Sequence, residues 1–140
     1  MRVLIAEDDA VSRTILKKAV QKLGHECLVA EDGEEAWKLF QKTEGVDVVI
    51  SDWMMPGVDG PELCRRVRAA DKDPYTFFVF LTALGDEEHL LEGMGAGADD
   101  YLSKPLDREQ LHIRLIAASR VNSLHRRINE LEAKLRKLDG

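Results

Sequence analysis

The 140-residue sequence has no long apolar run and only two cysteines. Its longest apolar run, residues 77–81, is far shorter than the ~20 residues needed to cross a bilayer. The acidic residues at positions 7–9 do not fit a secretory signal peptide. Cys27 and Cys64 lie in apolar stretches without CxxC spacing, which is typical of buried free thiols in a reducing compartment. These features predict a cytoplasmic protein without membrane association.

Positive charge is scarce outside the C-terminal segment. The whole chain carries a net charge of −6, while residues 120–140 hold six Lys and Arg against three Asp and Glu, a net +3. Residues 1–119 therefore carry −9. Such an acidic body repels the phosphates of nucleic acids over most of its surface, so we expect no direct nucleic acid binding.

Short apolar runs rich in β-branched residues recur without strict alternation, which is typical of strands buried on both faces. They fall at residues 3–6, 27–30, 46–50, 77–81 and 101–102. Segments with helical periodicity follow them, at residues 11–23, 32–40 and 60–70, from Asp86 onward, and from residue 107 to about residue 138. Five strand–helix units predict an α/β fold, with a doubly wound five-stranded parallel sheet and an extended C-terminal helix.

Polar residues follow four of these predicted strands. Because the carboxyl ends of parallel strands meet at one edge of a sheet, Glu7, Asp8, Asp52, Thr82 and Lys104 should lie close together. Converging carboxylates repel one another unless a cation neutralises them. Hard oxygen ligands, in a chain whose four histidines show no ligand spacing, favour Mg²⁺ over zinc. A carboxylate nucleophile, Mg²⁺, a lysine and a hydroxyl are the groups needed to accept and hold a phosphoryl group.

At these residues the sequence resembles the receiver domains of two-component response regulators. The motifs that carry the resemblance are LIAEDD at 4–9, SDWMMPGVDG at 51–60, LTA at 81–83 and GADDYLSKP at 97–105. The resemblance covers roughly residues 1–120 and implies a flavodoxin-like fold with strand order 2-1-3-4-5. It also implies that a sensor histidine kinase is the phosphodonor.

The resemblance further implies how the acidic residues divide their roles. Asp52 would be the phosphoacceptor and would also contact Mg²⁺. Asp8 would bind the metal directly, Glu7 through water, and Met54 through its backbone carbonyl. Many members of the family carry Asp where this chain has Glu7, and the longer side chain still fits a water-mediated contact.

The remaining motif residues match positions that complete the site. Lys104 would bind the phosphoryl group, and it would form a catalytic set with Asp52 and Thr82. Thr82 and Tyr101 match the pair that switches conformation after phosphorylation, and the Lys104–Pro105 bond would be cis. Such a domain assists its own phosphorylation and slow dephosphorylation, so we expect mainly a signalling module.

Three other readings of this chain can be weighed against specific residues. Aspartyl phosphatases and mutases carry a second acid two places after the nucleophile, where this chain has Met54. A dinucleotide-binding domain would have GxGxxG after the first strand, and none is present. A receiver that had degenerated into a scaffold would have lost Asp52 or Lys104, and both are present.

Residues from about 117 onward form heptads. The a positions are Val121, Ile128 and Leu135, and the d positions are Leu124, Leu131 and Leu138. β-Branched residues at two of the three a positions, with leucine at every d position, favour a parallel two-stranded coiled coil. In such a dimer the Arg127–Glu132 and Lys134–Asp139 pairs attract across the seam. The alternatives are a helix that folds back on its own domain and a basic zipper that grips DNA.

The length of the last helix argues against folding back. A helix over residues 107–138 would span ~48 Å, against a radius of gyration of ~13 Å for the domain. We therefore expect a receiver domain at 1–119 and a projecting coiled-coil extension at 120–140. A homodimer would form through residues 117–138 and act on an output domain that this chain lacks, with a diguanylate cyclase as the candidate.

Overall fold

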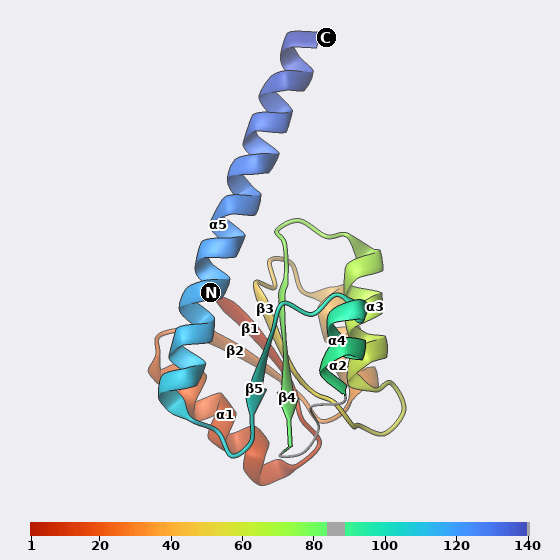
Figure 1. Cartoon of the computed structure of the whole chain (residues 1–140), viewed down its shortest axis with the longest axis vertical. Helices are drawn as coiled ribbons and strands as arrows, with labels where there is room; N and C mark the ends of the chain where they lie inside the picture. Colours follow the sequence, from red (N-terminus) through yellow and green to blue (C-terminus); the bar gives the residue numbers. More distant parts are fainter. Residues whose placement is uncertain (84–88, 140) are drawn as a thin grey trace.

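Five parallel strands form a single sheet in a computed structural model that describes residues 1–83 and 89–139 (Figure 1). The order across the sheet is β2-β1-β3-β4-β5. The strands are β1 (Arg2–Ala6), β2 (Glu26–Ala30), β3 (Val48–Asp52), β4 (Phe77–Thr82) and β5 (Asp100–Ser103). This arrangement confirms the predicted α/β class and the strand order 2-1-3-4-5.

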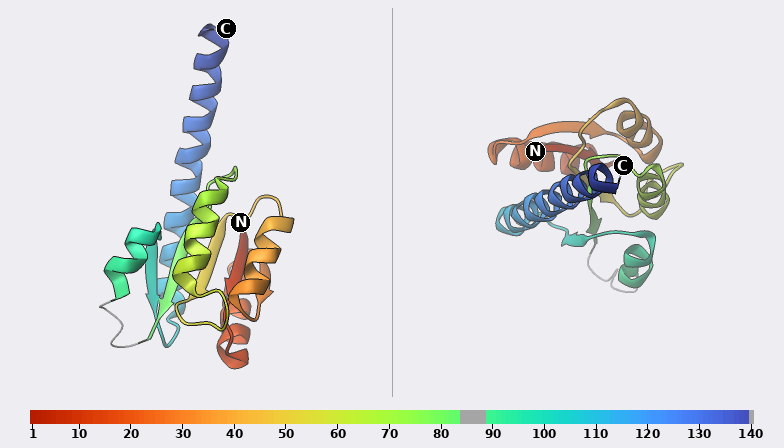
Figure 2. Two further views of the ribbon diagram at one scale, coloured as in Figure 1. Left: turned by 90° about the vertical axis from the view of Figure 1, so that its right-hand side faces the viewer. Right: turned by 90° about the horizontal axis from the view of Figure 1, so that it is seen from above.

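Helices cover both faces of the sheet (Figures 1 and 2). They are α1 (Ala10–Lys22), α2 (Gly33–Lys42), α3 (Gly60–Ala70), α4 (Leu90–Ala96) and α5 (Arg108–Asp139). Helices α1 and α5 pack on one face, and α2, α3 and α4 contribute to the core on the other. The expected start of the fourth helix, near Asp86, lies outside the described residues. Of the helices described, none is both long and apolar enough to span a membrane.

Aspartates fix where three of the helices begin. The side chains of Asp9, Asp32 and Asp59 each accept a hydrogen bond from the backbone N–H three residues later, at 2.8–2.9 Å. These bonds satisfy backbone donors that a helix leaves unpaired in its first turn. Asp9 is therefore the cap of α1, although it stands next to the predicted acidic pair.

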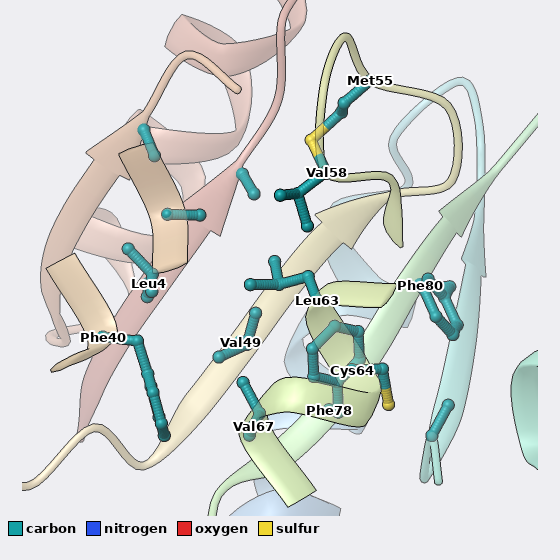
Figure 3. Packing of buried hydrophobic residues seen from close by; sticks show 14 of the residues in the cluster. Leu4, Phe40, Val49, Met55, Val58, Leu63, Cys64, Val67, Phe78 and Phe80 are labelled. Carbon is teal, nitrogen blue, oxygen red and sulfur yellow. The ribbon is translucent and has the colours of Figure 1, made fainter. Parts of the chain in front are cut away.

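Large apolar side chains from β1, β3 and β4 fill the space under α2 and α3 (Figure 3). Phe40, Leu63, Phe78 and Phe80 are almost completely buried there. Each such side chain contributes roughly 1.5–3 kcal/mol of apolar burial, which holds the strand ends in a fixed relation. Cys64 lies in the same core, and burial raises the pKa of its thiol to about 12, so it is an unreactive packing residue.

The last helix leaves the domain about halfway along its length. Leu111, Leu115 and Ala118 pack in the core, whereas the later turns of the helix extend beyond the sheet (Figures 1 and 2). The single helix Arg108–Asp139 confirms the predicted C-terminal extension.

Candidate metal centre

Three carboxylates meet at the carboxyl ends of β1 and β3. Ala6 and Ser51 are register partners on these neighbouring strands, so the acids that follow them emerge side by side. One oxygen from each of Glu7, Asp8 and Asp52 lies within 4.8 Å of the other two. Glu7 is fully buried, Asp52 is partly buried and Asp8 is exposed. This set of oxygen ligands suits a hard divalent cation that keeps some of its water.

Lys104 directly follows β5, two strands away from β3, and its side chain contacts this cluster. Its ammonium nitrogen lies 3.0 Å from Glu7 Oε2 and 3.1 Å from Asp52 Oδ2. The Lys104 backbone N–H donates to the carbonyl of Thr82 at 2.7 Å, which ties the residue after β5 to the end of β4. The Lys104–Pro105 bond is cis, as the family resemblance implies. The lysine thus supplies a fixed positive charge opposite the acids.

The environment of Glu7 also fits a cation. Its Oε2 atom has no hydrogen bond of good geometry, so its 3.0 Å approach to Lys104 is an ion pair without an aligned donor. Burial raises the pKa of Glu7, the Lys104 ammonium opposes that rise, and the Asp52 charge adds to it. Burial by itself would lower the pKa of Lys104, but its ion pairs with the Glu7 and Asp52 carboxylates raise it above the ordinary value. The cluster therefore holds an incompletely satisfied buried oxygen beside a protonated lysine.

Backbone contacts hold the two acids after β1 in place. The Asp9 N–H donates to Glu7 Oε1 at 3.1 Å, and the Arg13 guanidinium donates to the Glu7 carbonyl at 2.9 Å. The guanidinium also lies 3.4 Å from the Asp8 carbonyl. Sequence reasoning did not identify Arg13. Its position one helical turn after Asp9 was the available signal, because that spacing returns a side chain toward the start of the helix.

The loop after β3 is folded tightly against the strand. Asp52 Oδ1 accepts a hydrogen bond from the Trp53 N–H at 2.9 Å, and the Gly60 N–H donates to the Trp53 carbonyl at 2.9 Å. A Cβ at Gly60 would lie 2.5 Å from the Asp52 carbonyl oxygen, so this position leaves no room for a side chain. Met54 lies in this loop with 74% of its surface exposed. Its side chain therefore stays out of the core, and a role at the site would fall to its backbone.

The predicted switch residues lie on adjacent strands near the cluster. Thr82 is buried at the end of β4, and its hydroxyl donates to the Leu102 carbonyl of β5 at 3.5 Å. Tyr101 is half-buried against Phe80, and its hydroxyl donates to the Leu90 carbonyl of α4. Burial raises the pKa of this phenol. In this structure Tyr101 therefore occupies the inward position under α4, and the Thr82 hydroxyl is bonded to β5.

Comparison with known sequences agrees with this geometry. The profile of the family described as response regulator receiver domain matches residues 3–116. The chain is 37% identical over 131 residues to the uncharacterized transcriptional regulatory protein YrkP of Bacillus subtilis, covering 94% of this chain and 54% of that protein. It is 36% identical over 116 residues to a chemotaxis protein CheY homolog of Campylobacter jejuni, covering 82% and 89%. The chain spans about half the length of the transcriptional regulators it matches.

Solved structures give the same result. A response regulator receiver domain protein from Clostridium thermocellum superposes with a TM-score of 0.81 at 27% identity, covering 88% of this chain and 97% of that one. The receiver domain of the sensor histidine kinase PA1611 from Pseudomonas aeruginosa, with a magnesium ion coordinated in its active site cleft, gives 0.73 at 27% identity, covering 81% and 93%. The chain belongs to the response regulator receiver domain family.

Proposed function

We propose that this chain accepts a phosphoryl group from a sensor histidine kinase onto Asp52 in a reaction that requires Mg²⁺. The observation that carries the proposal is the convergence of Glu7, Asp8 and Asp52 with the ammonium group of Lys104. Membership of the receiver family supports it. The magnesium ion described for the PA1611 receiver supports the choice of metal.

Each side chain has a task that its position supports. A carboxylate oxygen of Asp52 attacks phosphorus, and the phosphorus–nitrogen bond of the donor phosphohistidine breaks with its electron pair returning to the imidazole. Lys104, already 3.1 Å from Asp52, is placed to hold an oxygen of the transferred group. Asp8, Asp52 and the Met54 carbonyl would hold Mg²⁺ directly, and Glu7 through water. The bound ion would neutralise charge on the phosphoryl oxygens.

The switch follows from the present partners of Thr82 and Tyr101. A phosphoryl oxygen on Asp52 would compete with the Leu102 carbonyl for the Thr82 hydroxyl, whose 3.5 Å bond is weak. Tyr101 already occupies the inward position, in which its hydroxyl bonds to Leu90, so movement of Thr82 would stabilise that position rather than create it. The proposed outcome is a change at α4 and β5.

The C-terminal helix would carry the output. Residues 1–119 would form the receiver unit and residues 120–140 the coiled-coil extension. An exposed apolar stripe runs along the extension and consists of Leu124, Ile128, Leu131, Leu135 and Leu138. A second copy of the chain is its proposed partner, because the stripe keeps a heptad spacing and the flanking charges attract in a parallel pair. The dimer would signal to an output module outside these residues, for which a diguanylate cyclase is the candidate.

The first a position differs from the others. Val121 packs against the core of its own domain, so the seam between two chains would begin at Leu124. Phosphorylation would then change the strength or the geometry of a seam of about two heptads. A coil this short is sensitive to small energies, since ~1.4 kcal/mol alters an association constant tenfold.

The direct test of the proposed function uses acetyl phosphate with Mg²⁺. Intact mass should show one added phosphoryl group on the wild type and none on Asp52→Asn. Chelation of the metal should prevent the addition. Equal addition to both proteins, or no addition to either, would contradict the assignment of Asp52.

A further inference from the structure

The loop between α3 and β4 contacts the C-terminal helix at the edge of the sheet opposite the acidic cluster. The ring of Tyr75 stacks on the ring of His125 with centroids 3.9 Å apart and planes 6° apart. One turn further on, Asn129 donates to Asp73 Oδ1 at 2.9 Å. These contacts join the loop to the part of α5 that extends beyond the sheet (Figure 1).

Tyr75 also contacts a cation that several hydrogen bonds hold in place. The Arg68 guanidinium lies 4.6 Å from the centre of the Tyr75 ring. Arg68 donates to the carbonyls of Gly97 and Thr76 at 2.8 and 2.6 Å, and to Asp99 Oδ2 at 2.7 Å. The Tyr75 ring thus contacts both an arginine of α3 and a histidine of α5.

Asp99 joins this stack to the switch side of the domain. Its Oδ1 accepts a hydrogen bond from the Tyr75 hydroxyl at 2.7 Å, and its Oδ2 accepts from the Phe78 N–H at 2.8 Å. Asp99 lies between α4 and β5, two residues before Tyr101. A displacement of the α4–β5 connection would therefore act on Tyr75 directly through its hydrogen bond to Asp99, and indirectly through Arg68, which bonds to Asp99 and contacts the Tyr75 ring.

We propose that Arg68, Tyr75, Asp99 and His125 form a clamp that holds the extension of α5 in one direction and couples that direction to the α4–β5 connection. The core packing of Leu111, Leu115 and Ala118 sets the start of the helix axis. The clamp holds the following turns, which have few apolar partners in their own domain. This role goes beyond phosphoryl transfer and does not require it.

The clamp also determines which face of the helix is available to a partner. The domain-facing residues are Asn122, His125, Asn129, Ala133 and Arg136, which either bond to the domain or line the cleft beside the loop. At 100° per residue, their mean direction lies roughly 140° around the helix from that of the exposed leucine and isoleucine stripe. A clamped helix therefore presents the stripe away from its own domain.

The test measures the distance between two spin labels in one chain by double electron–electron resonance. Labels attach at Lys38→Cys on α2 and Lys137→Cys near the end of α5, both exposed positions, in a Cys27→Ala background that keeps the buried Cys64. Dilution with unlabelled protein removes distances between chains. We expect one narrow distribution in the parent, and a distribution at least twice as wide in Tyr75→Ala and in His125→Ala.

His112→Ala is the matched control, because this exposed histidine lies on the same helix outside the clamp. The distance distribution of the Tyr75→Ala/His125→Ala double variant should be no wider than that of either single variant, because each substitution removes the same Tyr75–His125 stacking contact. If Tyr75→Ala does not fold, His125→Ala decides, because its position on the helix surface leaves the core intact. Distributions as narrow as the parent in both single variants would overturn the clamp.

The coupling of the clamp to the α4–β5 connection rests on the proposed function and is tested by a separate experiment. Beryllofluoride, whose fluorine atoms stand in for phosphoryl oxygens, should shift the distance in the parent but not in Arg68→Ala. An equal shift in both proteins would contradict the coupling through Arg68 and Asp99. A parent that binds no beryllofluoride, judged by unchanged Trp53 fluorescence, would count against the proposed function, while the unliganded comparison would still decide the clamp.

Discussion

The ammonium group of Lys104 lies 3.1 Å from Asp52 Oδ2, although the two residues are 52 positions apart in the sequence. The same ammonium lies 3.0 Å from Glu7, so a single positive charge faces two acids of a three-carboxylate cluster. The contacts of Lys104 should therefore differ between the free cluster and a cluster that holds a divalent cation or a phosphoryl group. The lysine offsets part of the negative charge of the acids, and a divalent cation or a phosphoryl group would redistribute its contacts.

Removal of that positive charge should destabilise the domain in a pH-dependent way. We expect Lys104→Ala to lower the free energy of unfolding at pH 7 by about 1–2 kcal/mol, because a buried carboxylate loses its partly exposed counter-ion. The pKa of Glu7 is already raised by burial, and it should rise further without the lysine. A carboxyl group whose pKa is raised by folding lowers the free energy of unfolding as the pH rises from its unfolded-state pKa to its folded-state pKa. The stability lost in Lys104→Ala should therefore be smaller at pH 5 than at pH 7. Urea unfolding at both pH values checks this, and an equal loss at both would contradict it.

Binding of Mg²⁺ should be visible in the fluorescence of Trp53. This residue directly follows Asp52 and is buried, with its ring 4.8 Å from Phe80 and 5.0 Å from His89. Titration with Mg²⁺ should change the emission of the wild type. The response should be absent in Asp8→Ala and weaker in Glu7→Ala.

Trp53→Phe is the control for that titration, because it leaves Trp37 of α2 as the single tryptophan and should give a flat signal. Matching titration curves for the wild type and Asp8→Ala would show that the acidic cluster does not hold the metal.

The switch residues give a structural prediction. In a beryllofluoride complex, the Thr82 hydroxyl should leave the Leu102 carbonyl and approach a fluorine atom, while Tyr101 keeps its bond to Leu90. Thr82→Ala should still accept phosphate on Asp52 but should lose the accompanying change in α4 and β5. Crystals of the free and trapped protein test this, and an unchanged Thr82 would disprove the mechanism.

The apolar stripe of the extension predicts a dimer that two substitutions abolish. Leu124→Asp together with Leu131→Asp should convert the protein to a monomer in light scattering, because both side chains are about half exposed and lie on the proposed seam. Ser119→Asp with Ser123→Asp adds the same two charges to other faces of α5 and should leave the dimer intact. A double leucine variant as dimeric as the wild type would place the interface elsewhere.

The bond between Tyr75 and Asp99 predicts a specific alkaline loss of stability. Burial and this bond raise the pKa of Tyr75 from its ordinary value of 10.0 to about 12. Tyr75→Phe should be less stable than the wild type by about 1–2 kcal/mol at pH 8, since Asp99 loses a donor. Between pH 10 and pH 12 the phenol ionises first in the unfolded wild type, which lowers wild-type stability alone, so the difference should shrink. A difference that stays constant in urea unfolding across this range would contradict the bond.

The sequence by itself determined the fold class and the edge of the sheet where the acids meet. Apolar runs of strand length alternate with helical periodicities, and these local patterns report which faces are buried. Because parallel strands end at a common edge, the residues after them converge whatever the details of packing. The order of strands and helices along the chain therefore groups Glu7, Asp8, Asp52 and Lys104.

The tertiary structure decided the pairings between distant polar groups. Thr82 bonds to Leu102, Tyr101 bonds to Leu90, and the Tyr75 ring stacks on His125, fifty residues later. The hydrophobic periodicity of the sequence does not predict such contacts, because they depend on the distances between side chains of elements that are far apart in the sequence. The heptad pattern likewise assigned Val121 to the seam between two chains, whereas the structure packs it against its own core. An apolar helix face has the same sequence pattern whether a second chain or its own domain covers it. Only the tertiary structure shows which of the two covers Val121.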